Sequence, residues 1–199
     1  MANTMFGINF SSKLSGNTVI CLLSKNKIFF IDVDEDVDAD IFIYNAAKHF
    51  QPEIIFLNAP LSIPGVFRSV NSCCDHQYRQ ADKEICGISP MIIGGVTARA
   101  MELKQKLESE FNTKVYETSS KAQAENYGLL TKGFKCGRKE LLECRFEITS
   151  HLDKNLMINC QDIKSWDHLN ALLSLITAIR FVNGEAHTHG ISEEGVIYV

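Results

Sequence analysis

The stretch TMFGINFSSKLSGNTVICLLSKNKIFFIDV, residues 4–33, decides the fold. It holds three apolar runs, at residues 4–10, 19–23 and 28–33. The turn-forming residues SSKLSGNT separate the first two runs, and the polar step SKNK separates the last two. Short apolar runs with turn residues between them are typical of neighbouring antiparallel strands. The stretch therefore predicts a three-stranded antiparallel meander.

Helical and extended patterns follow the meander. Residues 41–50 carry apolar side chains at helical spacing, after acidic residues that suit the positive end of a helix. Residues 53–57 form a short continuous apolar run, which predicts a strand buried on both faces. We also expect a strand over 114–116 and helices over 97–111, 121–130, 139–149 and 166–182. This order predicts an α/β fold in which helices flank a mixed sheet.

Composition and charge are those of an ordinary globular chain. The 199 residues are 45% hydrophobic and 22% charged, which excludes collagen-like and low-complexity classes. Twenty Lys and Arg against 24 Asp and Glu give a formal net charge of −4. Tight non-specific nucleic-acid binding usually needs a basic excess, so this net charge argues against that function. It does not exclude an enzyme that contacts nucleic acid through a local patch. The length predicts one domain, or one core with an appended subdomain.

Targeting signals are absent from the pattern. The first residues lack the basic and apolar regions of a signal peptide, and no apolar run approaches the roughly 20 residues that cross a bilayer. The seven scattered cysteines are interpreted as reduced thiols. We expect a cytoplasmic protein that does not bind membranes.

Seven short motifs resemble one nuclease family, in the family's order. They are GINFS at 7–11, LNAPL at 57–61, YRQAD at 78–82, VTAR at 96–99, VYE at 115–117, DHLNA at 167–171 and EGVI at 194–197. With the strand order, they resemble the ribonuclease H-like superfamily and, within it, the predicted-nuclease family catalogued as domain of unknown function 429. The resemblance implies one ribonuclease H-like domain over 1–199. Its mixed five-stranded sheet has three antiparallel strands and then parallel ones, with a helical insertion at about 65–165.

The resemblance also implies two-metal phosphodiesterase chemistry. Family members hold two divalent ions between carboxylates at the ends of the first and fourth strands and on a late helix. Here Asn9 and Asn58 stand at the strand ends, and Asp167 and Asn170 on the helix. An Asn carbonyl can contact a metal ion but brings no charge to offset the ion's dehydration. Three amides in place of three carboxylates therefore predict loss of the metal site.

The resemblance marks the residues of the inferred cleft as well. Its catalytic positions are Asn9, Asn58, Glu117, Asp167 and Asn170, and its substrate-binding positions are Arg79, Asp82, Thr97, Arg99, Lys139 and Glu194. Asp167 and Glu117 are the candidates for a weak metal site. As an alternative, Asp82 and Glu117 form ion pairs with Arg79 and Arg99, which carry the matching charge.

Three further patterns have a simple structural interpretation. The acidic run at 32–40 lacks the Gly and Glu positions of a calcium loop, so we interpret it as an acidic helix entry. His187 and His189 lack a third ligand and are interpreted as part of an exposed loop. The sequence GGVT at 94–97 resembles a phosphate-holding turn of actin-like ATPases, but those proteins need a second core for which this chain is too short.

A local basic cluster completes the set of candidates. It consists of Lys132, Lys135, Arg138, Lys139 and Arg145. Such a cluster is either a solvated helix face or a set of contacts to phosphate. The second interpretation comes from the resemblance, since the family's basic residues at this point flank the inferred cleft.

Two hypotheses for the function follow. In the first, the protein is catalytically impaired or inactive as a metal-dependent nuclease and keeps a binding cleft for nucleic acid or a phosphorylated ligand. In the second, it is an active nuclease or phosphodiesterase that uses Mg²⁺ or Mn²⁺ in a rearranged site formed by Asp167, Glu117 and Glu194. A purely structural homodimer is a third possibility.

Overall fold

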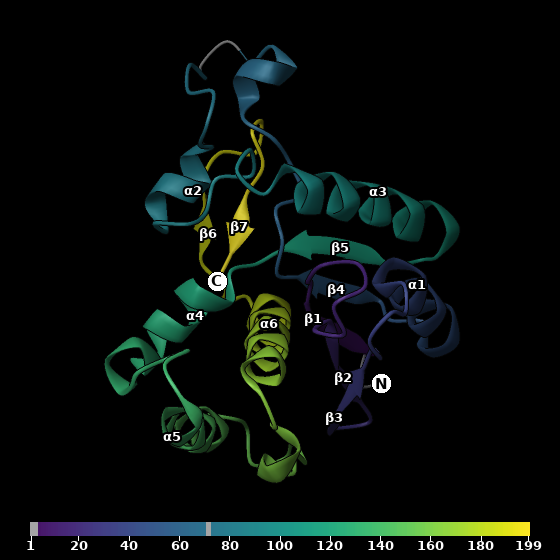
Figure 1. Ribbon diagram of the computed structural model, residues 1–199, viewed down its shortest axis with the longest axis vertical. Helices are drawn as coiled ribbons and strands as arrows, with labels where there is room; N and C mark the ends of the chain where they lie inside the picture. The colour runs from purple at the N-terminus through teal and green to yellow at the C-terminus, as the bar shows by residue number, and fades with distance from the viewer. Residues whose placement is uncertain (1–3, 71–72) are drawn as a thin grey trace.

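Five strands form one mixed sheet in the order β3-β2-β1-β4-β5. The computed structural model describes residues 4–70 and 73–199. The strands are β1 Met5–Asn9, β2 Val19–Ser24, β3 Lys27–Asp32, β4 Ile54–Leu57 and β5 Lys114–Glu117. The first three are antiparallel, while β4 runs parallel to β1 and β5 parallel to β4 (Figure 1). This confirms the predicted α/β fold, a mixed five-stranded sheet with three antiparallel strands and then parallel pairs.

A two-residue turn fixes the register of the meander. Lys25 and Asn26 both adopt left-handed backbone conformations, with φ of 50° and 63°, and Ser24 pairs with Lys27 across the turn. Turns with positive φ at both central residues match the right-handed twist of the strands they join. The turn therefore sets every cross-strand pair from β2 to β3.

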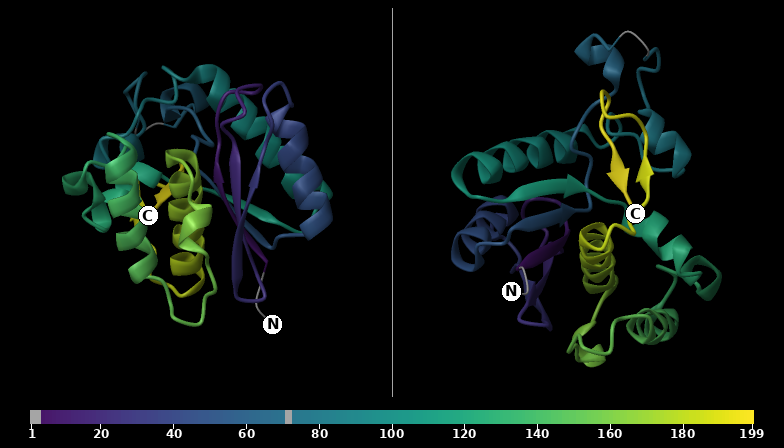
Figure 2. Two further views of the ribbon diagram at one scale, coloured as in Figure 1. Left: turned by 60° about the horizontal axis from the view of Figure 1, so that its bottom comes forward. Right: turned by 180° about the vertical axis from the view of Figure 1, so that it is seen from behind.

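Helices cover both faces of the sheet. They are α1 Ala39–Phe50, α2 Gln80–Glu84, α3 Gly94–Glu110, α4 Ser120–Asn126, α5 Arg138–Ser150 and α6 Trp166–Val182. Helices α1 and α3 lie on one face, and α6 lies on the other with α4 and α5 outside it (Figure 2). Within residues 4–70 and 73–199, none of the helices combines the length and the apolar character that a membrane crossing needs.

The two faces of the sheet have separate cores because side chains alternate along a strand. In β2, Ile20 and Leu22 pack with the core under α1 and α3, whereas Val19, Cys21 and Leu23 pack with the core under α6. All five of these side chains are buried. A strand buried on both faces shows an apolar run rather than an alternating pattern, as this sequence does.

Helix α6 crosses β1 at very short range, and Gly7 makes this possible. A Cβ atom on Gly7 would lie 2.0 Å from the backbone nitrogen of Leu175 and 2.4 Å from the carbonyl oxygen of Ala171. The close approach brings the N-terminal turn of α6 against the carboxyl end of β1. The site described below depends on this contact.

The acidic stretch enters α1 as predicted. The side chain of Asp38 caps the helix by accepting from the backbone N–H groups of Asp40 and Ile41, and it forms an ion pair with Lys13. A carboxylate at this position satisfies free N–H groups and interacts favourably with the helix dipole.

Several boundaries differ from the predictions. Helix α3 begins at Gly94, three residues before its expected start. Helix α4 ends at Asn126, because Gly128 turns into a left-handed conformation with φ of 65° and a 3-10 helix, η2 Leu129–Lys132, follows. The range 65–165, expected as a helical insertion, also contains β5 and the crossover helix α3, which belong to the sheet and its cover.

The C-terminal region forms a ribbon that the sequence analysis missed. Strand β6, Thr188–His189, pairs antiparallel with β7, Ile197–Tyr198, so His189 lies in a strand and not in the expected loop, whereas His187 lies in an exposed loop as predicted. Thr118 bridges in parallel to Tyr198, which attaches the ribbon to the end of β5. Two residues per strand are too few to leave a periodic pattern in a sequence.

Candidate ligand-binding cleft

The first part of the site is a polar cluster where β1 meets α6. Asn9 Nδ2 donates to the carbonyl of Asn17 and to Asp167 Oδ1, both at 2.9 Å. Asn9 Oδ1 accepts from Asn170 Nδ2 at 3.2 Å. Asn9 and Asn170 are buried, and Oδ1 of Asn170 has no hydrogen-bond partner among the described residues. The structure thus brings three of the predicted catalytic positions into direct contact.

Asp167 carries the single negative charge of this cluster. Burial raises the pKa of the Asp167 carboxyl, whereas the hydrogen bond from Asn9 and the positive charge of Lys135 act in the opposite direction. With Asp at positions 9 and 170, three carboxylates would crowd together and need cations between them. The amides replace that repulsion by hydrogen bonds.

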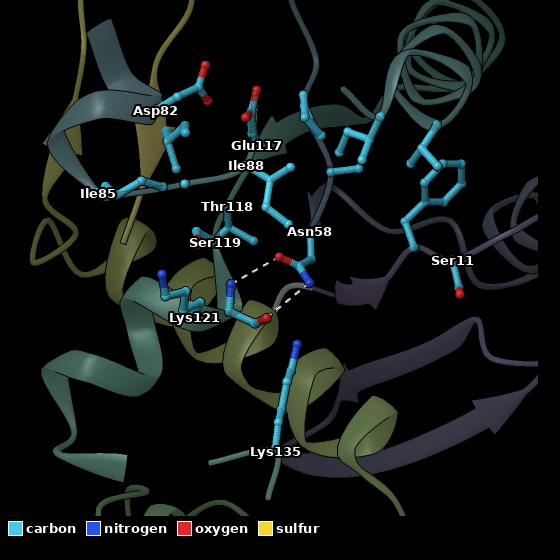
Figure 3. Close-up of a pocket in the computed structure, with 18 of the residues that line it drawn as sticks. Ser11, Asn58, Asp82, Ile85, Ile88, Glu117, Thr118, Ser119, Lys121 and Lys135 are labelled. Atoms are coloured by element: carbon cyan, nitrogen blue, oxygen red, sulfur yellow. Dashed lines mark hydrogen bonds between the residues drawn. The ribbon is translucent and has the colours of Figure 1, made fainter. Parts of the chain in front are cut away.

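The second part is Asn58, which follows β4. Its Oδ1 accepts from the backbone N–H of Ser120, and its Nδ2 donates to Ser120 Oγ, each at 3.0 Å (Figure 3). The orientation of the amide is fixed because a backbone N–H can only donate. Asn58 therefore joins the end of β4 to the start of α4 through two hydrogen bonds.

The third part is a buried ion-pair network around Arg79. This guanidinium is fully buried, and it bonds to Asp82 Oδ1 at 2.7 Å and to both Glu117 oxygens, at 2.6 and 2.7 Å. Burial alone would lower the pKa of Arg79, but the hydrogen bonds that Arg79 donates to Glu117 and Asp82 raise it. Burial raises the pKa of Glu117, with Arg79 opposing. The expected pairing of these acids with an arginine thus holds for Arg79.

The expected pairing with Arg99 is wrong. Arg99 lies on α3 and bonds to Asp40 in the first turn of α1, at 2.7 and 2.9 Å, and its guanidinium covers the ring of Phe10. Helices α1 and α3 pack side by side on the same face of the sheet, which places Arg99 beside Asp40 and away from Asp82 and Glu117.

Other predicted binding residues serve the scaffold. Glu194 Oε1 accepts from the backbone N–H of Gly65 at 2.7 Å and Oε2 from that of Gln80 at 2.6 Å, which ties the C-terminal ribbon to the segment after β4. Burial would raise the pKa of Glu194, but these two backbone hydrogen bonds lower it. Thr97 Oγ1 donates to the Pro90 carbonyl. Lys139 is exposed on α5.

A cleft of about 550 Å³ opens beside these parts, at the carboxyl ends of β4 and β5. Asn58, Asp82 and Glu117 are the predicted site residues that line it. Its walls are the segments 85–96 and 118–135, which carry apolar side chains such as Ile85 and Ile88 together with hydroxyl groups and lysines. A volume of this size is typical of pockets for small molecules.

Two lysines of the cleft, Lys121 and Lys135, were not predicted as site residues. Lys135 belongs to the basic cluster that the sequence shows, but the pattern does not distinguish it from the other members. In the structure its side chain points toward Asn58 (Figure 3). The surrounding walls desolvate the Lys135 ammonium and lower its pKa, while Asp167 acts to raise it.

The residues present do not fit a divalent metal ion. In the part of the chain that the structure describes, no group of three His, Cys, Asp or Glu side chains is placed to hold one. Asp167 has only amides as close neighbours in its cluster, and both oxygens of Glu117 are bound by Arg79. Mg²⁺ and Mn²⁺ need several oxygen ligands with negative charge, which this edge of the sheet does not offer.

Comparisons with known proteins give a likeness among solved structures. No protein-family model matches the chain, and a search of curated proteins finds no relative. Among solved structures, the chain is similar to Thermus thermophilus RuvC, with 11% sequence identity and a TM-score of 0.40, over 92% of this chain and 97% of that chain.

Proposed function

We propose that this protein is a metal-independent binding protein, in which the nuclease chemistry of the resembled family is lost and the cleft at the edge of the sheet is kept. The observation that carries this proposal is the cluster of Asn9, Asp167 and Asn170. It holds one carboxylate where two divalent ions would need several, and its amides hydrogen-bond to one another and to that carboxylate.

The alternative of an active nuclease with a rearranged site finds less support. It requires Asp167, Glu117 and Glu194 to act together on metal ions. Glu117 is bound by Arg79 and by the backbone N–H of Leu61, and Glu194 by two backbone N–H groups. Freeing either carboxylate would break buried charge-assisted hydrogen bonds, at a cost of about 1.5–3 kcal/mol for each bond.

The ligand class follows from the charges of the cleft. Lys121 and Lys135 supply positive charge at one end, whereas Asp82 and Glu117 at the other end are engaged by Arg79. An anionic ligand, whether nucleic acid or a phosphorylated small molecule, is favoured by this arrangement over a cation.

The test compares metal binding with nuclease activity. We expect MnCl₂ to cause neither heat in calorimetry nor a thermal shift in the wild-type protein, and DNA and RNA to remain intact with Mg²⁺ or Mn²⁺. The triple variant Asn9→Asp, Asn58→Asp, Asn170→Asp restores the carboxylates and is expected to bind Mn²⁺.

A matched control separates site chemistry from added charge. Changing the exposed residues Asn112, Asn155 and Asn183 to Asp adds the same three negative charges away from the cleft. It should leave Mn²⁺ binding absent. Metal-dependent cleavage by the wild-type protein that disappears in Asp167→Ala would overturn the proposal.

A further inference from the structure

The hydrogen bonds of Asn58 change what Ser120 can offer to a ligand. Because Asn58 Nδ2 donates to Ser120 Oγ, the hydroxyl proton of Ser120 is left to donate elsewhere. An aspartate at position 58 would be an acceptor only, and the same hydroxyl would have to turn toward it. With an amide at position 58, Ser120 can therefore present its hydroxyl proton to a ligand in the cleft instead of donating it to residue 58.

Ser119 adds a second hydroxyl of the same kind. Its Oγ accepts from the backbone N–H of Ala122 at 3.3 Å, which leaves its proton available as well. Both serines line the cleft. Two neighbouring hydroxyl groups whose protons are left to donate suit an anion.

Two ammonium groups belong to the same cleft as these serines. Lys121 and Lys135 both line the cleft, and in Figure 3 the side chain of Lys135 points toward Asn58. Lys121 Nζ donates to the carbonyl of Cys86 at 3.1 Å and has further protons to donate. Within residues 4–70 and 73–199, neither lysine forms an ion pair with a carboxylate, so both charges are available to a ligand.

The opposite wall of the cleft is apolar. Ile85 and Ile88 line it, and the side chain of Ile88 is 65% exposed. Exposed apolar side chains beside a charged corner favour a ligand with an anionic group attached to a less polar body.

The charge balance favours a small ligand over a polyanion. A strand of nucleic acid is usually held by many phosphate contacts along a basic track. Here the cleft has two lysines at one end, carboxylates at the other, and a chain with a net charge of −4 around it. One phosphate group matches the two ammonium and two hydroxyl groups.

We propose that Ser119, Ser120, Lys121 and Lys135, with Asn58 orienting Ser120, form a site for the phosphate group of a small phosphate ester whose body lies against Ile85 and Ile88. We name these five residues the phosphate corner. The inference rests on the proposed function, since it assumes a cleft that works without metal ions. It adds the ligand class and the residues that recognise it.

The experiment uses the full chain with three probes: inorganic phosphate, adenosine monophosphate and a twelve-residue oligothymidylate. Adenosine, which lacks the phosphate group, is the matched control compound for adenosine monophosphate. In ¹H–¹⁵N NMR spectra of the wild-type protein, inorganic phosphate at millimolar concentration should shift the amides of residues 118–121 and 134–136. Adenosine monophosphate should bind more tightly than adenosine in calorimetry.

Variants of Lys135 test the recognition directly. Lys135→Gln should weaken binding of adenosine monophosphate by about tenfold or more, because it removes a charge-assisted hydrogen bond. Lys135→Arg should retain most of the affinity. Lys48→Gln removes the same charge from the exposed face of α1 and should change nothing.

The outcomes that overturn the inference are distinct from those that overturn the proposed function. Absence of any phosphate-induced shift at 118–121 and 134–136 in the wild-type protein would refute the phosphate corner, while the Mn²⁺ titration still decides the metal question. Tight, strongly salt-dependent binding of the oligothymidylate that survives Lys135→Gln would also refute it, in favour of a nucleic-acid surface. The NMR measurement needs no variant, so a folding defect cannot obscure the result.

Discussion

At the scale of single residues, three asparagines and one arginine determine the chemistry of this edge of the sheet. Asn9, Asn58 and Asn170 act as hydrogen-bond donors where carboxylates could only accept. Arg79 binds both Asp82 and Glu117 within the interior and offsets one of their two negative charges, so these carboxylates are structural groups here. Both effects reduce the affinity of the site for cations.

The Arg79 network gives a prediction about stability. Arg79→Met should lower the free energy of unfolding by about 3–5 kcal/mol, because it leaves two buried carboxylates without a countercharge. Urea unfolding followed by circular dichroism measures the loss. Lys132→Met removes a half-exposed ion pair with Glu147 and should cost less than about 1 kcal/mol. Equal costs for the two variants would contradict the assigned role of Arg79.

A second residue-scale prediction concerns His168. Its Nδ1 lies 2.9 Å from Ser165 Oγ and its Nε2 3.0 Å from Asp32 Oδ1. Burial lowers the pKa of His168 below its ordinary 6.5, with Asp32 opposing. Between the lowered pKa and 6.5 the unfolded chain binds a proton that the folded protein does not bind. The free energy of unfolding should therefore fall as the pH drops below 6.5.

Urea unfolding at a series of pH values measures this dependence. His168→Gln should make the acid side of the profile flatter, because the titrating group is gone. His151→Gln changes an exposed histidine on the surface and should leave the profile as it is. A profile that His168→Gln leaves unchanged would show that other groups cause the dependence.

At the scale of elements, the contact between α6 and β1 decides where the site residues meet. The sequence predicts both elements well, because the apolar run of β1 and the long helical period of α6 are local patterns. It does not predict how closely they approach. That depends on Gly7, whose missing side chain leaves room for the backbone of α6.

The element-scale prediction is therefore a matched pair of glycine substitutions. Gly7→Ala should lower the free energy of unfolding by about 3 kcal/mol or more, because a methyl group would collide with the backbone of α6. Gly95→Ala lies in α3, where an added Cβ meets nothing within 4 Å, and should stabilise the protein by up to about 1 kcal/mol. Thermal unfolding of both variants checks the contrast. A mild effect of Gly7→Ala would mean that α6 can move away from the sheet.

At the scale of the whole molecule, the C-terminal ribbon holds together segments that are far apart in the chain. Glu194 reaches the backbone of Gly65 and Gln80, and Thr118 donates from the end of β5 to the carbonyl of Tyr198. These bonds attach the segment after β4 to the sheet (Figure 1). They support the wall of the cleft that carries Ile85 and Ile88.

Glu194→Gln tests this connection. The amide keeps one acceptor and turns a donor toward the second backbone N–H, so we expect a loss of about 1–3 kcal/mol in stability. Hydrogen exchange at the amides of Gly65 and Gln80 should become faster at the same time. Glu193→Gln changes the exposed neighbour and serves as the control. Unchanged exchange at Gly65 and Gln80 would refute the role of Glu194.

Lys135 shows where prediction from the sequence ends. The basic cluster between 132 and 145 is visible in the sequence, but its members point in different directions once the chain folds. Lys132 pairs with Glu147 and Lys139 stands exposed on α5, whereas Lys135 reaches into the cleft. The backbone φ of Lys135 is 66°, a value that residues with a Cβ atom rarely adopt. The amino-acid composition gives no sign of this conformation.

The five strands of the main sheet, its longer helices and the amides at positions 9, 58 and 170 follow from the amino-acid sequence alone, because apolar periodicity, turn residues and side-chain chemistry are local properties. Three other features come only from the tertiary structure: the partner of each charged group, the direction of the Asn58 hydrogen bond and the position of Lys135. Each depends on distances between segments as far apart as residues 58 and 120. Such distances are set by the packing of whole elements against the sheet.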